Sequence, residues 1–170
     1  LFATTELKFL KTVLEKGGKI GALCIQDHQF TRSELDSLVQ WATAAGAAGL
    51  LWIKVAEGFK LESPVAKFLP ESFIAALKNT FGDLRIGDTL FVIAGDYEDA
   101  WELLGRLRLE LGRRLDLIDY NQINLSWITD FPLFEYDKQT KSWSAKHHPF
   151  TSPEAGWENL APKDMKARSY

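Results

Sequence analysis

The sequence is poor in the residues that mark exported, metal-binding and membrane-spanning proteins. Its 170 residues include one cysteine, one methionine and three histidines. A single cysteine excludes an internal disulfide, and zinc sites of the common kind need several ligands at close spacing. Cys24 lies among the apolar residues Ala22, Leu23 and Ile25. These neighbours predict a buried, reduced thiol in a cytosolic protein, because a reactive cysteine needs basic neighbours instead.

Long apolar runs and a large net charge are absent as well. A membrane helix needs about 20 consecutive apolar residues, and the longest apolar run here, residues 44–53, is interrupted by Gly46 and Gly49. The net charge of -3 excludes nucleic-acid binding driven by bulk positive charge alone. The sequence contains no P-loop, nucleophile motif or dinucleotide-binding glycine motif. Hydrophobic residues nevertheless make up 46% of the chain, which is enough for a packed core.

The first residue is Leu1, and the only methionine is Met165. The sequence therefore has no initiator methionine, and it has no signal-peptide pattern. We expect an excised piece of a longer protein.

Apolar periodicity predicts alternating helices and strands up to about residue 115. Helices are expected at residues 4–16, 32–45, 70–79 and 97–111, and strands at 19–25, 50–56 and 89–94. Such alternation usually indicates a parallel α/β sheet. An α+β layer, with helices on one face of a mostly antiparallel sheet, stays open because periodicity does not distinguish the two.

Helix boundaries have their own signals. Thr31 and Glu34 have the spacing of a capping box, and Asp96 can cap the last long helix. Gly17, Gly46 and Gly112 are expected to end helices.

The sequence becomes polar and loses its regular apolar spacing at residues 116–124, and we place a domain boundary at about residue 120. Residues 126–135 are expected to form a strand that enters a hairpin. Residues 137–142 would be its polar turn, and residues 143–146 its return strand.

His147 and His148 are the first candidate binding residues. Adjacent residues in an extended segment point to opposite faces, so one imidazole can face a ligand while the other packs behind it. Pro149 and Pro153 stiffen the loop. The alternative is a surface pair in a turn. A metal site is not expected, because the third histidine, His28, is far away in the sequence.

Two further groups of charged residues invite a functional interpretation. Asp130 and Glu135 are five residues apart, but carboxylates in a turn explain them better than a catalytic pair. Four arginines of the last long helix could contact RNA phosphates: Arg106, Arg108, Arg113 and Arg114. The acidic residues among them favour an ordinary solvated helix face.

Several stretches, in order along nearly all of the chain, resemble bacterial aspartyl-tRNA synthetases, which are class II enzymes. Two of them resemble the catalytic domain between class II motifs 2 and 3: Trp127–Glu135 and His147–Pro153. Others resemble the insertion called the GAD domain, which also occurs in tRNA-dependent amidotransferases: Gly46–Leu50, Ile53–Val55, Ser63–Leu69 and Leu107–Gly112. Lys146 departs from the hydrophobic residue, often methionine, that the family has before its histidine pair.

The resemblance implies an α+β fold in two parts. Residues 1–118 would be a GAD insertion domain of DCoH-like architecture, with a mostly antiparallel sheet and helices. Residues 119–170 would be part of a class II catalytic domain, ending in a hairpin strip of its sheet.

The resemblance also implies a function. The family's enzymes activate L-aspartate with ATP and magnesium and transfer it to tRNA(Asp), in some bacteria also to tRNA(Asn). The first histidine of the family's pair holds aspartate, which implies this role for His147 and, less directly, for His148. The family's catalytic arginines would lie outside this chain, so we expect no catalytic residue, bound cofactor or activity in the chain itself. The longer enzyme would be a cytoplasmic homodimer.

Overall fold

The computed structural model describes residues 2, 5–70, 72–127, 129–137, 139–148 and 150–168. The chain divides into two compact units, Leu1–Asp119 and Tyr120–Tyr170. In the described residues, no helix is both long enough and apolar enough to cross a membrane.

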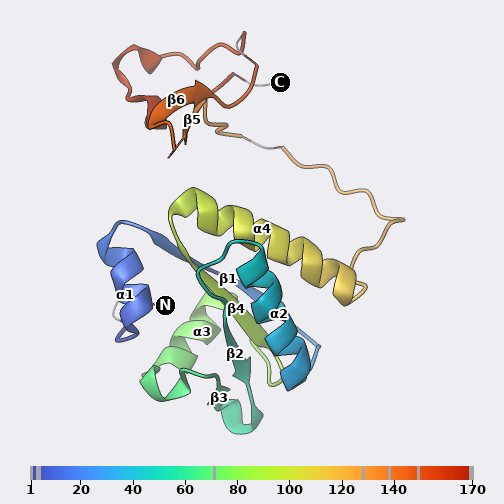
Figure 1. Ribbon diagram of the computed structural model, residues 1–170. Helices are drawn as coiled ribbons and strands as arrows, with labels where there is room; N and C mark the ends of the chain where they lie inside the picture. Colours follow the sequence, from blue (N-terminus) through green and yellow to red (C-terminus); the bar gives the residue numbers. More distant parts are fainter. Residues whose placement is uncertain are drawn as a thin grey trace. The chain divides into compact units, whose positions relative to one another are not determined.

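The first unit is built on a four-stranded sheet in the order β1-β4-β2-β3, in which every neighbouring pair is antiparallel (Figure 1). The strands are β1 (Lys19–Ile25), β2 (Leu51–Val55), β3 (Leu61–Glu62) and β4 (Thr89–Gly95). The helices are α1 (Lys8–Glu15), α2 (Arg32–Ala44), α3 (Phe73–Phe81) and α4 (Tyr97–Arg114). Short 3-10 turns lie at Glu57–Phe59 and Ala66–Phe68.

The parallel sheet that simple alternation indicates is wrong, and the antiparallel α+β alternative is right. β1 and β2, joined through α2, both pair with β4, and each runs antiparallel to it. They therefore run parallel to each other with β4 inserted between them, as in a split β-α-β unit. Periodicity along the chain does not reveal such an insertion, because it depends on a strand that comes later in the sequence.

Helices cover both faces of the sheet, not one face. On one face α2 and α4 pack against Trp52, Phe91 and Ile93. On the other, α1 and α3 pack against Ile53, Leu90 and Val92 (Figure 1). The alternation of side chains along β4 sends successive residues into the two cores. Within β4, residues 89–93 are buried.

The expected helix boundaries are confirmed at several positions. Thr31 caps α2 in a complete capping box with Glu34. Gly17 and Gly46 follow α1 and α2 with φ of 81° and 99°, the left-handed conformation that glycine adopts without strain. Asp96 is the N-cap residue of α4, although its side chain makes no capping hydrogen bond. The first helix starts later than expected: residue 4 lies outside the described residues, residues 5–7 are not helical, and α1 begins at Lys8.

Gly112 does not end α4, contrary to expectation. The helix continues to Arg114, and Asp116 takes the left-handed position with φ of 53°. The amide of Leu117 donates to the carbonyl of Gly112 at 2.9 Å, and the amide of Asp116 donates to the carbonyl of Arg113 at 3.3 Å. These two hydrogen bonds form a Schellman motif. A Cβ at position 112 would lie 3.3 Å from Cγ1 of Ile118, so glycine here makes room for that side chain.

The second unit contains the expected hairpin. β5 (Phe134–Asp137) and β6 (Ser142–Ala145) pair antiparallel, and two 3-10 turns follow at Trp157–Asn159 and Pro162–Asp164. In the turn, Oδ1 of Asp137 accepts from the amides of Gln139 and Thr140. The described residues from 126 to 133 form no strand before the hairpin.

Cys24 is half-buried in β1 rather than fully buried. Burial, with smaller contributions from Asp88 and Asp83, raises the pKa of its thiol to about 11. The thiol therefore stays protonated at neutral pH and is a weak nucleophile, as expected.

Replacing Asp116 by glycine should stabilise the protein by about 1 kcal/mol, because a left-handed conformation costs any residue with a Cβ. Thermal or urea unfolding of Asp116→Gly measures this. Gly17→Ala is the matched control and should change stability in the opposite direction, since it introduces a Cβ at the same kind of position. Equal stability of Asp116→Gly and the parent chain would contradict the account of the helix end.

Alkylation of Cys24 should be slow at pH 8 and should accelerate as pH rises towards about 11, the folded-state pKa. The sign follows from the raised pKa, since the reactive thiolate appears only as pH approaches it. Iodoacetamide labelling over a pH series, with the urea-unfolded chain as control, measures the difference. A folded chain that labels as fast as the unfolded one at pH 8 would contradict it.

Candidate functional site

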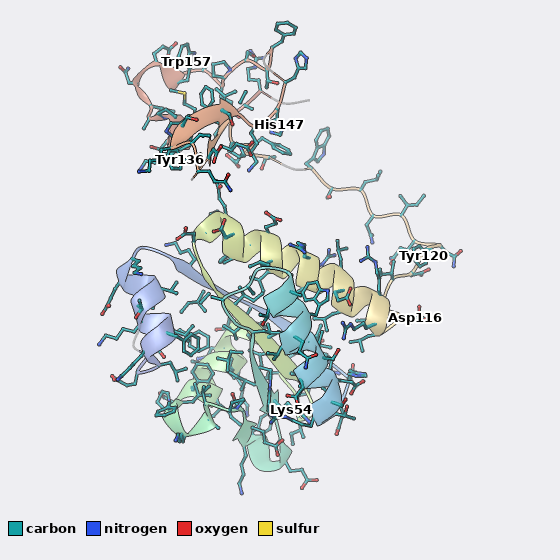
Figure 2. All side chains as sticks on the ribbon, viewed as in Figure 1. Lys54, Asp116, Tyr120, Tyr136, His147 and Trp157 are labelled. Atoms are coloured by element: carbon teal, nitrogen blue, oxygen red, sulfur yellow. The ribbon has the colours of Figure 1, made fainter. Side chains whose placement is uncertain are left out.

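The two candidate histidines follow β6 and have different surroundings; Figure 2 labels His147. His147 is half-buried, and its ring meets the ring of Phe131 edge-on at 4.9 Å between centroids. Its Nε2 atom is buried and has no hydrogen-bond partner among the described residues. Because a buried polar atom without a hydrogen-bond partner destabilises the fold, this atom is a candidate for a hydrogen bond with a ligand.

His148 is exposed and makes local contacts only. Its Nδ1 accepts from the amide of Phe150 at 3.3 Å, and its ring lies 4.8 Å from that of Phe150. The carbonyl of His148 accepts from the amide of Thr151. These bonds shape the loop, and Pro149, which was expected to stiffen it, lies outside the described residues.

Three extended segments of the second unit support His147. The segment 165–168 lies between residues 131–133 and residues 152–154, and it pairs with both. On one side, the amide of Leu133 donates to Met165, and that of Ala167 donates to Phe131. On the other, the amide of Glu154 donates to Lys166, and that of Arg168 donates to Ser152. This small framework fixes Phe131, and through its ring it fixes the position of His147.

Asp130 and Lys166 form an ion pair beside this framework. The hydrogen bond from Lys166, with a second from Thr129, holds the pKa of Asp130 below its usual value. The same bond raises the pKa of Lys166. Asp130 has φ of 60°, a conformation that residues other than glycine rarely adopt. Sequence patterns gave no indication of Lys166, which is distant from Asp130 along the chain.

Asp130 and Glu135 do not come together as a pair of carboxylates. The partner of Asp130 is Lys166, and Glu135 lies in β5, where it pairs across the hairpin with Ser144. Within the described parts of the chain, no three histidine, cysteine or acidic side chains are grouped so that they could hold a metal ion.

The four arginines of α4 do not form one patch. Arg106 donates to the carbonyl of Ala45 at the end of α2. Arg114 donates to Glu110 and to Ser37 of α2. These two arginines tie α4 to α2. Arg108 and Arg113 are exposed, and neither side chain makes a hydrogen bond or ion pair with the residues that the structure describes.

One stretch of the second unit exposes alternate large apolar side chains. Ile123, Leu125 and Trp127 are 85%, 94% and 96% exposed, and polar Asn124 and Ser126 stand between them. This period of two is the pattern of a strand with one buried face. The described residues supply no partner for it, since no strand covers this stretch.

The family model described as "GAD domain" matches residues 10–104. An aspartate–tRNA(Asp/Asn) ligase of Caldanaerobacter subterraneus is 38% identical over 170 residues, which are 98% of this chain and 28% of that protein. One of Nitratidesulfovibrio vulgaris is 46% identical over 143 residues, 82% of this chain and 23% of that protein. An aspartate–tRNA ligase of Shouchella clausii is 41% identical over 172 residues, 98% and 29% of the two. The chain thus spans less than a third of the length of these relatives.

Proposed function

The chain belongs to the GAD domain family, in the form found in bacterial aspartyl-tRNA synthetases, and we propose that it serves within an enzyme that attaches L-aspartate to tRNA(Asp). In this proposal residues 1–118 are the DCoH-like GAD insertion, and residues 119–170 are part of a class II catalytic domain. Two of the relatives are named for both tRNA(Asp) and tRNA(Asn), so the proposed enzyme could acylate either tRNA.

The observation that carries the proposal is the buried, unpartnered Nε2 of His147. An imidazole nitrogen held by the edge contact with Phe131 is positioned to form one directed hydrogen bond with a polar ligand. We assign that ligand as L-aspartate. His148 supports the loop through its bond from Phe150, and we propose it as the weaker contributor.

The second unit supports the proposal because it exposes apolar side chains that a larger sheet would cover. Its exposed alternate side chains at Ile123, Leu125 and Trp127 suit a strand within a larger sheet, here the proposed catalytic sheet. The described residues offer no metal-binding group and no phosphate-binding loop. We propose that ATP and magnesium, which the family implies, are bound by the rest of the enzyme, and we expect the chain alone to be inactive.

A chimera tests the role of His147. Residues 10–168 would replace the matching segment of the Caldanaerobacter enzyme, which aligns with 98% of this chain. Aspartate-dependent ATP–pyrophosphate exchange is then measured. His147→Ala should raise the KM for aspartate about 10- to 100-fold, because a hydrogen bond to a charged group contributes about 1.5–3 kcal/mol. The KM for ATP should change little.

His28→Ala is the matched control in the same chimera. Its Nε2 is also buried and makes no hydrogen bond with the described residues, although it lies 3.6 Å from a carboxylate oxygen of Glu34. Because His28 lies in the first unit, the KM for aspartate should stay the same. His148→Ala should have a smaller effect than His147→Ala. If His147→Ala left the KM for aspartate unchanged in an active chimera, the proposed role would be wrong.

A second function, RNA contact by α4, is favoured by one observation only: Arg108 and Arg113 are exposed and unpartnered in the described structure. They are not neighbours on the helix, since a separation of five residues places them about 140° apart around its axis. If both contact phosphates, Arg108→Ala/Arg113→Ala should weaken tRNA(Asp) binding by the 170-residue chain. It should also reduce the salt dependence of log K by about 2.

The control for this test is Arg106→Ala/Arg114→Ala, which removes the same charge. Because these arginines bond to α2, their loss should lower the melting temperature while the salt dependence stays nearer that of the parent chain. Fluorescence anisotropy with labelled tRNA at several salt concentrations measures both. An unchanged salt dependence in the Arg108/Arg113 variant would exclude this function for α4.

A further inference from the structure

The two edges of the four-stranded sheet differ in how they are protected. One edge is β3, which has only two residues and ends in the charged Glu62. The other is β1, seven residues long, and its register with β4 is continuous from Lys19 to Ile25. From Ile20 to Ile25 it contains no charge, proline or bulge, the features by which proteins usually block pairing with another chain.

The outer side of β1 is unpaired in the described structure. Its strand partner is β4, and the backbone groups of residues 19–25 make no other backbone hydrogen bonds among the described residues. The side chains reflect this position. Residues 89–93 of β4 are buried, whereas Ile20, Ala22 and Leu23 in β1 are only half-buried. A strand added here would both complete the hydrogen bonding and cover these side chains.

Apolar surface flanks this edge on both faces of the sheet. On the α4 face, the rings of Tyr97 and Trp101 lie 4.8 Å apart and are 57% and 42% exposed as residues. Trp101 lies over Gly21, where a Cβ would come within 3.2 Å of the indole ring and 2.3 Å of Leu104. On the other face a hollow of about 510 Å³ opens beside the strand, with Leu14, Ile20 and Phe81 in its lining.

We propose that β1 pairs with β1 of a second copy of this chain, antiparallel and about a two-fold axis at Ala22. Strand charge favours this occupant and this direction. Lys19 begins the strand, and the exposed Asp27 follows its other end. With the axis at Ala22, antiparallel pairing places Lys19 of each copy opposite Ile25 of the other and diagonal to Asp27, two residues further along, whereas parallel pairing would place like charges together.

The arrangement is self-complementary, as a two-fold interface requires. An axis perpendicular to the sheet keeps each α4 on the same face, so the aromatic pairs Tyr97–Trp101 of the two copies approach each other there. Gly21 and Ala22, which are small, lie at the centre where the two strands are closest. The result is one continuous sheet of two four-stranded halves. This inference stands on the first unit alone and does not depend on the role of His147.

Sedimentation equilibrium of the 170-residue chain over a range of concentrations tests the association. A monomer–dimer equilibrium is expected. Lys19→Glu, which places a like charge diagonal to Asp27 of the other copy, should raise the dimer Kd by about fivefold, within the range of exposed charge pairs. Lys163→Glu changes the net charge equally but lies in the second unit, and it should leave the Kd unchanged. A chain that stays monomeric at every concentration overturns the proposal.

Disulfide trapping tests the register. In a Cys24→Ser background no other thiol remains, and Ala22→Cys places the new thiols opposite each other, within reach of a disulfide. Mild oxidation should give a covalent dimer, visible on a non-reducing gel. Glu62→Cys in the same background, on the opposite edge, is the control and should crosslink more slowly by at least about tenfold. Equal rates for the two variants would overturn the proposed pairing even if the chain dimerises.

Discussion

The burial of β4 is the constraint on which the first unit depends. This strand hydrogen-bonds to β1 on one side and to β2 on the other, and its side chains enter both cores. Phe91 and Ile93 belong to one core, and Leu90 and Val92 to the other. Each such side chain contributes about 1.5–3 kcal/mol by leaving water. The two helical layers therefore share one strand, and neither would have a complete core without it.

The strand also carries polar groups into the interior at its start. Asp88 is 1% exposed, and its carboxylate accepts from the amide of Arg85 while its carbonyl accepts from Val55. Thr89 is fully buried, and its hydroxyl has no partner among the described residues. These contacts close the turn before β4 and so help to set the point at which the inserted strand enters the sheet.

Much of the first unit could be predicted from the sequence because its signals are local. The capping box at Thr31, the glycines at 17 and 46 and the apolar spacing in each helix act within a few residues, and the structure contains them. Strand order depends on contacts between distant residues, so the insertion of β4 was not foreseen. The expectation that Gly112 ends α4 was wrong for a related reason. Glycine at this position leaves room for the side chain of Ile118, which lies beyond the helix.

The second unit shows the opposite balance. The resemblance drew attention to His147 and His148, but nothing in the sequence indicated that one would be half-buried beside Phe131 and the other exposed beside Phe150. The sequence also gave no sign of the pairing of Asp130 with Lys166. The two residues are far apart along the chain and meet only because the segment 165–168 pairs with residues 131–133.

The contact between Gly112 and Ile118 has a practical consequence for anyone who wishes to divide the chain. Regular helix stops at Arg114, and a truncation guided by secondary structure alone would end there. Such a truncation would remove Asp116 and Leu117, whose amides satisfy the last carbonyls of the helix, and would uncover the side of α4 that Ile118 shields. The compact first unit thus extends past its last helical residue, and a genetic dissection should retain at least residue 118.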